Sequence, residues 1–369
     1  MSKSGQILNL TLGGGGVKGI AYSGVFEAAE RYGIKWANIS GVSAGALAGA
    51  FLAAGYNSDQ IKKITGEFDF GKIEYGRIPE KLPIVSRYMQ YRKSSRNNAI
   101  HSVEQYLNLR FREGTEDGFQ GNSDFSVYRG NLLKNVLTFS KEGALFNGDY
   151  LEEWVYKVLM DRGVKTFADL KTGIRDKTNP SGYKVRMTAV DISRNKVIIL
   201  PDDIGFYGIE PDRLEVAKAV RMSTSVPFAF FPVELKKSEG NSSKAHLIVD
   251  GGVFDGFPFW LIEDRLNPPT AGFKLSGGKK HSIISIETPL NIFKSLVSAV
   301  HDIGVPKNLY YRGYLAKINT AKVDFLDFSL NDEQKRYLYD SGKSSARFLF
   351  SKISKDLQKP GRKLWVIKT

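Results

Sequence analysis

The first 55 residues alternate between apolar runs of strand length and apolar residues at helical spacing. Residues 6–12 are typical of a buried strand, and residues 17–33 place apolar side chains near the 3.6-residue spacing of a helix that closes at its final glycine. Residues 34–42 predict a second short strand, and the small residues of 44–55 predict a second helix. The order strand, helix, strand, helix implies a parallel sheet with right-handed crossovers.

Farther along the chain the pattern breaks down and then returns. From about residue 70 to 148, aromatic, basic and turn residues are mixed without a regular period, which indicates an insertion or cap. Regular patterns after it predict helices over 149–162, 214–225, 290–303 and 331–353, and strands over 183–192, 195–200, 246–252 and 281–287. Strands and helices thus alternate over much of the chain, as in α/β proteins.

Length and composition are those of a globular chain. The 369 residues suffice for one large domain with an appendage, or for two modest domains. The sequence contains no cysteine, which excludes disulfides and thiolate chemistry. The four histidines lie far apart, without the spacing of metal ligands, at His101, His246, His281 and His301. We expect no metal ion.

The formal net charge of the chain is +14. Such a charge attracts anionic surfaces, which include both nucleic acids and acidic lipid headgroups. No aromatic RNA-binding signature such as RGFGFV is present. Charge alone does not choose between these partners. Together with the aromatic, basic segment 75–96, it leads us to expect an anionic membrane surface, and we expect no nucleic acid as partner.

The chain shows neither of the usual membrane signals. Its N-terminal apolar stretch is too short for a secretory signal peptide. The longest nearly apolar run, residues 44–54, is about half as long as a transmembrane helix requires. We expect no cleavable signal peptide and no transmembrane helix, and a location in the cytoplasm or at the periphery of a membrane.

The pentapeptide GVSAG, residues 41–45, lies between a predicted strand and a predicted helix. It has the G-x-S-x-G pattern of a nucleophile elbow in the context that this pattern requires. Small flanking residues permit a sharp turn, which lifts the hydroxyl of Ser43 clear of the backbone and directs the following helix N-terminus at the reacting oxygen. Ser43 is therefore the candidate nucleophile.

A run of four glycines follows the first predicted strand. A serine nucleophile needs backbone N–H donors near the developing oxyanion, and Gly14, Gly15 and Gly16 can face Ser43 from the neighbouring strand. The run also fits, with Gly19, the dinucleotide-binding pattern G-x-G-x-x-G. That fingerprint needs an acidic residue at the end of the second strand, which is absent here, and the chain has no G-x-x-x-x-G-K-[ST] phosphate loop.

The candidate nucleophile also needs a base. His281 and His301 fit poorly, because one begins a predicted strand and the other lies within a predicted helix. Asp250 follows a predicted strand and precedes two glycines that permit a close approach. A carboxylate whose basicity is tuned by its site can take a proton from serine. Asp255 is the nearby rival, but it lacks the setting of a strand followed by glycines.

The motifs GGGGVKG, GVSAG and DGG, in this order, resemble those of the patatin-like phospholipase family. The stretches MTAVDIS and AVRMSTSVPFAFFPV are also similar to this family, and the resemblance covers roughly residues 5–265. It implies a catalytic dyad of Ser43 as nucleophile and Asp250 as base, with the three glycine amides named above as the oxyanion hole. It implies no cofactor.

The resemblance also bears on residues around the dyad. Lys18 takes the basic position of the glycine motif, where it steadies the loop, favours an anionic headgroup or is simply solvated. Asp191 takes a strand-end position with a structural role. The sequence departs from the family at Gly13, where plant patatins have aspartate. It also departs at residues 255–258, where Asp-Gly-Phe-Pro stands in place of the Asn-Asn-Pro that often follows DGG, and this changes the support of Asp250.

The fold implied by the resemblance is a three-layer α/β/α fold of patatin type with a mostly parallel central sheet. Its catalytic domain is expected over residues 5–265, with the cap or insertion at about 70–148. A mixed C-terminal extension of unknown role is expected over 270–369.

The implied activity is that of a lipid acyl hydrolase of phospholipase A type, which cleaves carboxylic esters of phospholipids or related lipids. Two alternatives stay open. Acyl transfer to an acceptor other than water would use the same acyl-enzyme. A basic membrane-binding or nucleic-acid-binding protein on an inactive hydrolase scaffold is the non-enzymatic alternative, and the presence of both Ser43 and Asp250 argues against it.

Overall fold

The computed structural model describes residues 6–69, 146, 148–227, 229–239, 242–262, 268–277, 311–325, 327, 329–357 and 366–367. The predicted strand at 281–287 and the predicted helix at 290–303 lie outside these residues, as do nearly all of the expected cap and the histidines His101, His281 and His301.

The N-terminal elements follow the predicted order: β1 (Ile7–Leu12), α1 (Ala21–Arg31), β2 (Lys35–Gly41) and α2 (Ala44–Ala53). A 3-10 helix, η1 (Gly16–Ile20), precedes α1, so the single helix expected over 17–33 is divided. The N–H of Lys18 donates to the carbonyl of Gly15 at 3.2 Å, three residues back, which is the 3-10 pattern.

The other helices are α3 (Ser58–Glu67), α7 (Asp149–Met160), α8 (Val216–Ser223) and α10 (Asp332–Leu357). The other strands are β3 (Val185–Asp191), β4 (Lys196–Leu200), β5 (Val233–Glu239), β6 (Ser242–Asp250), β7 (Thr270–Ser276), β8 (Tyr311–Arg312), β9 (Tyr314–Asn319) and β10 (Val366–Ile367). Short 3-10 helices are η3 (Phe167–Leu170), η4 (Asp202–Tyr207), η5 (Pro211–Arg213), η6 (Gly251–Val253) and η7 (Phe259–Leu261). The sequence patterns did not predict α3 or the strands β5, β7, β8, β9 and β10.

The central sheet is mixed, with the strand order β5-β6-β3-β2-β1-β7-β9 and with β4 paired to β3. The strands from β3 to β9 in this order are parallel, and β4, β5 and β6 form antiparallel pairs at the other side. β1 is central and has neighbours on both sides, so its side chains are buried on both faces of the sheet. The α/β class and the mostly parallel sheet confirm the prediction.

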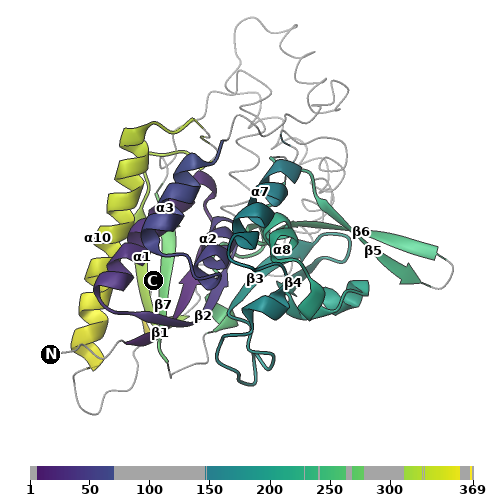
Figure 1. Ribbon diagram of the computed structural model, residues 1–369, viewed down its shortest axis with the longest axis horizontal. Coiled ribbons are helices and arrows are strands. Elements are labelled where there is room, and N and C mark those ends of the chain that lie inside the picture. The colour runs from purple at the N-terminus through teal and green to yellow at the C-terminus, as the bar shows by residue number, and fades with distance from the viewer. Residues whose placement is uncertain are drawn as a thin grey trace, which may run out of the picture.

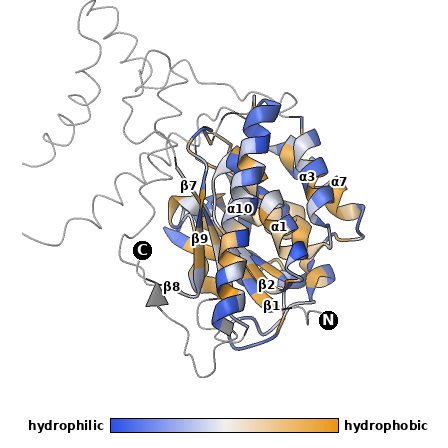
Figure 2. Cartoon of the chain, turned by 90° about the vertical axis from the view of Figure 1, so that its left-hand side faces the viewer, coloured by the Kyte–Doolittle hydropathy of each residue, from blue (hydrophilic) through white to orange (hydrophobic). Residues whose placement is uncertain are grey.

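The α-helices of the described residues gather on one face of this sheet (Figures 1 and 2). Right-handed crossovers explain why α1 and α2 lie on the same face, because β1, β2 and β3 are added in one direction. The chain returns from β6 to β7 through residues 251–262, whose Phe257 and Phe259 are fully buried and meet the sheet at Gly272. This segment, and not an α-helix, covers that part of the second face.

Two strands from residue 270 onward, β7 and β9, belong to the same sheet as the N-terminal strands, whereas β8 and β10 pair with each other in a separate two-stranded sheet. β7 pairs with β1, β9 pairs with β7, and α10 lies along α1 in Figure 2. The expected boundary between residues 265 and 270 stays a prediction, but the strands on its two sides form one sheet. No helix in the described part of the chain is long and apolar enough to cross a bilayer.

Two glycines allow the backbones of α1 and α10 to approach closely. A Cβ atom at Gly342 of α10 would lie 1.9 Å from the carbonyl oxygen of Ala21, and one at Gly24 of α1 would lie 2.1 Å from that of Tyr339. Such contacts leave no space for a side chain, so the helices would have to separate to accept one.

Replacing Gly342 by alanine should therefore lower the free energy of unfolding by about 2 kcal/mol through overpacking. Gly66 is the matched control, because it also lies in a helix but has no atom within 4 Å of its virtual Cβ. Gly66→Ala should stabilise the protein by about 0.5–1 kcal/mol through helix propensity. Urea unfolding followed by circular dichroism measures both, and effects of the same sign would contradict this account of the helix contact.

An ion-pair network also joins the two helices. Glu27 of α1 lies 3.0 Å from the Nζ atom of Lys343 on α10 and 2.5 Å from the guanidinium of Arg31. Burial alone would raise the pKa of Glu27, but the hydrogen bonds and charges of Lys343 and Arg31 outweigh it and hold the pKa below its ordinary value of 4.5.

A carboxyl group with a lowered pKa in the folded state stabilises the fold above its unfolded pKa and loses this contribution as the pH falls. Glu27→Gln should thus lower the free energy of unfolding by about 1 kcal/mol at neutral pH. The difference from the wild type should shrink as the pH falls below 4.5. Denaturant titrations across this range measure it, and a difference that stays constant to low pH would show that the charge of Glu27 is not responsible.

Candidate active site

Ser43 occupies the sharp turn between β2 and α2. Its backbone has φ 54° and ψ −123°, a conformation that residues with a side chain rarely adopt. A Cβ atom at Gly41 would lie 2.5 Å from the carbonyl oxygen of Gly45, and one at Gly45 would lie 2.2 Å from that of Leu12. The G-x-S-x-G spacing is therefore a steric requirement of packing α2 against β1 and β2.

The amide of Ser43 is held by a second serine. The N–H of Ser43 donates to Oγ of Ser223 at 3.0 Å, and the hydroxyl of Ser223 donates to the carbonyl of Thr188 at 2.8 Å. Ser223 is the last residue of α8, and Thr188 lies in β3. These bonds satisfy the amide of the turn and fix Ser43 relative to the neighbouring strand.

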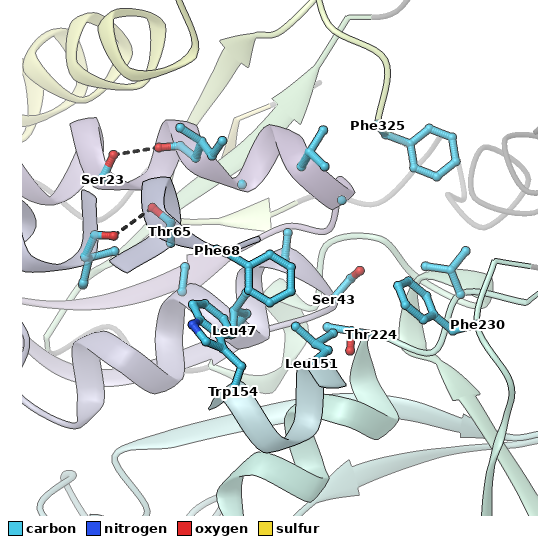
Figure 3. Close-up of a pocket in the computed structure, with 18 residues that line it drawn as sticks. Ser23, Ser43, Leu47, Thr65, Phe68, Leu151, Trp154, Thr224, Phe230 and Phe325 are labelled. Atoms are coloured by element: carbon cyan, nitrogen blue, oxygen red, sulfur yellow. Dashed lines mark hydrogen bonds between the residues drawn. The ribbon is translucent and has the colours of Figure 1, made fainter. Parts of the chain in front are cut away.

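The side chain of Ser43 borders an apolar cavity of about 120 Å³ (Figure 3). The cavity lies between α2, α3, α7 and the η1 segment, and its larger side chains are those of Leu47, Phe68, Leu151, Trp154, Phe230 and Phe325. Two of its hydroxyl groups bond to their own helices, Ser23 to the carbonyl of Ile20 and Thr65 to that of Ile61. The lining therefore offers mainly hydrocarbon contacts, which suit an acyl chain.

Asp250 is the last residue of β6, which runs antiparallel to β3, whereas β2 runs parallel to β3. β3 lies between their two strands, with Gly41 paired to Met187 and Asp250 paired to Ala189, two residues farther along β3. The turn of Ser43, two residues beyond Gly41, and Asp250 therefore lie at a similar level on the two sides of β3. Asp250 is almost completely buried, with 1% of its surface exposed, and Ser43 is 3% exposed.

The end of α8 connects the surroundings of the two residues. The N–H of Asp250 donates to the carbonyl of Ser225 at 2.9 Å, two residues after the Ser223 that binds the amide of Ser43. The N–H of Gly252 donates to Oδ1 of Asp250 at 2.6 Å, which fixes the orientation of the carboxylate. One rigid turn therefore supports both members of the candidate dyad.

The three candidate oxyanion glycines differ in their hydrogen bonding. The N–H of Gly14 donates to the carbonyl of Gly256 at 2.9 Å. The amides of Gly15 and Gly16 donate no hydrogen bond to any residue that the structure describes. Gly14 would have to leave Gly256 to bind an oxyanion, whereas the other two amides are available in the structure as it stands.

The glycine-rich turn requires residues without side chains. A Cβ atom at Gly15 would lie 2.5 Å from Leu275, and one at Gly16, which has φ 57°, would lie 2.1 Å from the carbonyl oxygen of Phe325. The Nζ atom of Lys18 donates to the carbonyl of Gly277 at 3.0 Å, just beyond β7. This bond supports the loop-steadying interpretation of Lys18.

Asp255 has a different environment from Asp250. One of its oxygens accepts the N–H of Phe257 at 2.9 Å, and the other accepts the indole N–H of Trp260 at 3.1 Å. Burial raises the pKa of Asp255, although these two hydrogen bonds oppose the shift. Both oxygens thus support the 251–262 segment, and neither residue bound to Asp255 lines the cavity beside Ser43.

Asp191 lies in a separate buried network. Its Oδ1 atom accepts the amides of Ser193 and Arg194, and its Oδ2 atom accepts the hydroxyl of Tyr207 at 2.7 Å and lies 3.0 Å from Nδ1 of His246. These contacts give Asp191 a structural role in the β3–β4 turn. His246 does not line the cavity beside Ser43. Among the described residues, no group of three metal-ligating side chains could hold a metal ion.

Sequence reasoning missed Ser223 and Phe325. Ser223 belongs to the quoted stretch AVRMSTSVPFAFFPV, whose run of small polar residues at a helix end was the available signal. Phe325 follows β9, and the pairing of β9 in the sheet brings this residue close to the glycine-rich turn. No local pattern around Phe325 indicates this position.

Comparison with known proteins places these features in a family. The model of the family described as patatin-like phospholipase matches residues 10–262. The chain is 29% identical to the uncharacterized protein YqhO of Bacillus subtilis over 337 residues, which cover 89% of this chain and 93% of that protein. It is 25% identical to the uncharacterized protein R571 of Acanthamoeba polyphaga mimivirus over 361 residues, which cover 93% of each.

Among solved structures, VipD from Legionella pneumophila is similar with a TM-score of 0.48 and 18% sequence identity, over 95% of this chain and 67% of that chain. The segment that matches the family model spans more than half of the chain and includes the turn of Ser43, the glycine-rich turn and Asp250. The chain therefore belongs to the patatin-like phospholipase family.

Proposed function

We propose that this protein is a lipid acyl hydrolase of phospholipase A type that uses Ser43 as nucleophile and Asp250 as base. Family membership supports a lipid hydrolase activity in general. The observation that carries the finer proposal is the position of Ser43, which stands in a strained turn beside a cavity lined by hydrocarbon. A buried apolar cavity stabilises an acyl chain by about 25 cal/mol for each Å² of apolar surface removed from water.

The first half of the reaction acylates the serine. Oγ of Ser43 attacks the ester carbonyl carbon while its proton passes to the carboxylate of Asp250. The carbonyl oxygen becomes an oxyanion, which the amides of Gly15 and Gly16 stabilise. Collapse of the tetrahedral intermediate breaks the bond to the alcohol oxygen, and the alcohol leaves with the proton from Asp250.

The second half releases the acid. Asp250 takes a proton from water, the hydroxyl oxygen attacks the acyl carbon, and the same glycine amides bind the second oxyanion. Ser43 then leaves with the proton held by Asp250, and the fatty acid departs. Acyl transfer would follow the same steps with another alcohol in place of water, so analysis of the products distinguishes the two reactions.

Substitution of the dyad tests this mechanism. Ser43→Ala removes the nucleophile and should lower fatty-acid release from phospholipid vesicles by at least about 1,000-fold. Asp250→Asn removes the base while keeping the shape and should lower it by at least about 100-fold. Asp255→Asn is the matched control, because Asp255 is a buried carboxylate only five residues away whose two oxygens accept hydrogen bonds from Phe257 and Trp260.

The measurement is kcat/KM for each variant, corrected for the folded fraction from circular dichroism. Asp255→Asn should stay within about threefold of the wild type. If Asp255→Asn lost as much activity as Asp250→Asn, or if Asp250→Asn stayed active, the assignment of the base to Asp250 would be wrong.

The charge of the chain supports a role for an anionic membrane surface. With a net charge of +14, the protein should bind vesicles that contain anionic lipid more tightly than neutral vesicles. We expect at least about tenfold tighter binding at about 30 mol% anionic lipid, and loss of most of this difference between about 0.1 and about 0.5 M salt. Sedimentation with vesicles measures both effects, and binding that is indifferent to anionic lipid would contradict the electrostatic attraction.

A further inference from the structure

A residue from beyond the matched family segment takes part in the cavity beside Ser43. Phe325, in the connection between β9 and α10, lines the cavity with its side chain. Its carbonyl accepts the N–H of Val17 at 3.1 Å and lies against Gly16 of the glycine-rich turn. The backbone of Phe325 therefore fixes its ring beside the reacting groups.

The cavity extends to both sides of Ser43. Figure 3 shows Leu47, Phe68 and Trp154 on one side of Ser43, and Phe230 and Phe325 on the other. The larger lining side chains on both sides are apolar, and none of the side chains that line the cavity is charged.

The path of the proton distinguishes the two sides. Asp250 delivers its proton to the departing alcohol, so the alcohol part of the ester lies toward Asp250. The amide of Asp250 is bound to the carbonyl of Ser225, and Val226 and Phe230, one and five residues after Ser225, line the cavity. The side with Phe230 and Phe325 is therefore the alcohol side, and the side with Phe68 and Trp154 receives the acyl chain that is cleaved.

An apolar wall on the alcohol side selects among lipids. A lipid with one acyl chain presents only its glycerol and headgroup on the alcohol side. Contact of these polar groups with two phenylalanine rings contributes no favourable binding free energy. A lipid with two chains presents a second hydrocarbon chain, which does gain from this contact.

We propose that Phe325, with Phe230, forms a subsite for the second hydrocarbon chain, and that the enzyme prefers lipids with two chains to lipids with one. The inference rests on the proposed function of Ser43 and Asp250. Phe325 is a specificity-determining residue, and the segment after β9 supplies it from outside the part of the chain that matches the family.

The test compares diacyl phosphatidylcholine with lysophosphatidylcholine of the same acyl chain, each in micelles of a non-ionic detergent. The variants are Phe325→Ala, the conservative Phe325→Leu and the control Phe348→Ala. Phe348 lies on α10 and is 75% exposed, so its substitution removes an identical ring that does not line the cavity. Substitution leaves the carbonyl of residue 325 in place, and circular dichroism gives the folded fraction of each variant.

The wild type should prefer the diacyl lipid by about tenfold in kcat/KM. Phe325→Ala should lower kcat/KM for the diacyl lipid by about tenfold, mainly through KM, and should leave the one-chain lipid within about twofold. The kcat/KM of Phe325→Leu for the diacyl lipid should lie between those of the wild type and Phe325→Ala. Phe348→Ala should match the wild type on both lipids.

Three results would overturn the inference: a wild type that prefers the one-chain lipid, an equal loss on both lipids in Phe325→Ala, or no loss on either lipid in Phe325→Ala. An equal loss would mean that Phe325 only supports the glycine-rich turn. If neither lipid released fatty acid in a manner that depends on Ser43, the proposed function itself would fail, and the inference with it.

Discussion

The constraint on which the site depends is the close approach of backbone to backbone around Ser43. α2 lies so near the ends of β1 and β2 that neither Gly41 nor Gly45 has space for a Cβ atom. This contact requires the positive φ of Ser43, and the bond from its amide to Ser223 then fixes the turn against β3. The orientation of the candidate nucleophile is thus a result of how the sheet and its first helices pack.

The glycine-rich turn shows the same dependence on distant parts of the chain. Its first residues bond to β7 and to the segment after β6, while its later residues bond to the connection after β9. Tyr22 of α1 adds a hydrogen bond of 2.5 Å to the carbonyl of Gly13. Hydrogen bonds to residues from both the N-terminal and the C-terminal parts of the chain therefore hold the turn that would bind the oxyanion. They keep its amides oriented before a substrate arrives.

The sequence predicted the parts of the site that lie in local patterns. A strand, a turn of small residues and a helix define the position of Ser43, and a strand followed by two glycines defines that of Asp250. The patterns did not predict β7, because TAGFKLS alternates poorly and gains its place from pairing with β1 and β9. The position of Phe325 at the site was not predicted for the same reason, because its contact with Gly16 depends on the register of a strand and not on neighbouring residues in the sequence.

The pairing of β1 with β7 also has a consequence for the order of events during synthesis. The two strands are separated by more than 250 residues, so their contact closes a very long loop and forms late in folding. While the chain is still on the ribosome, the glycine-rich turn lacks its acceptors at Phe273, Gly277 and Phe325. The glycine-rich turn is thus completed only after translation has passed residue 325, so the candidate site stays incomplete in the nascent protein until then.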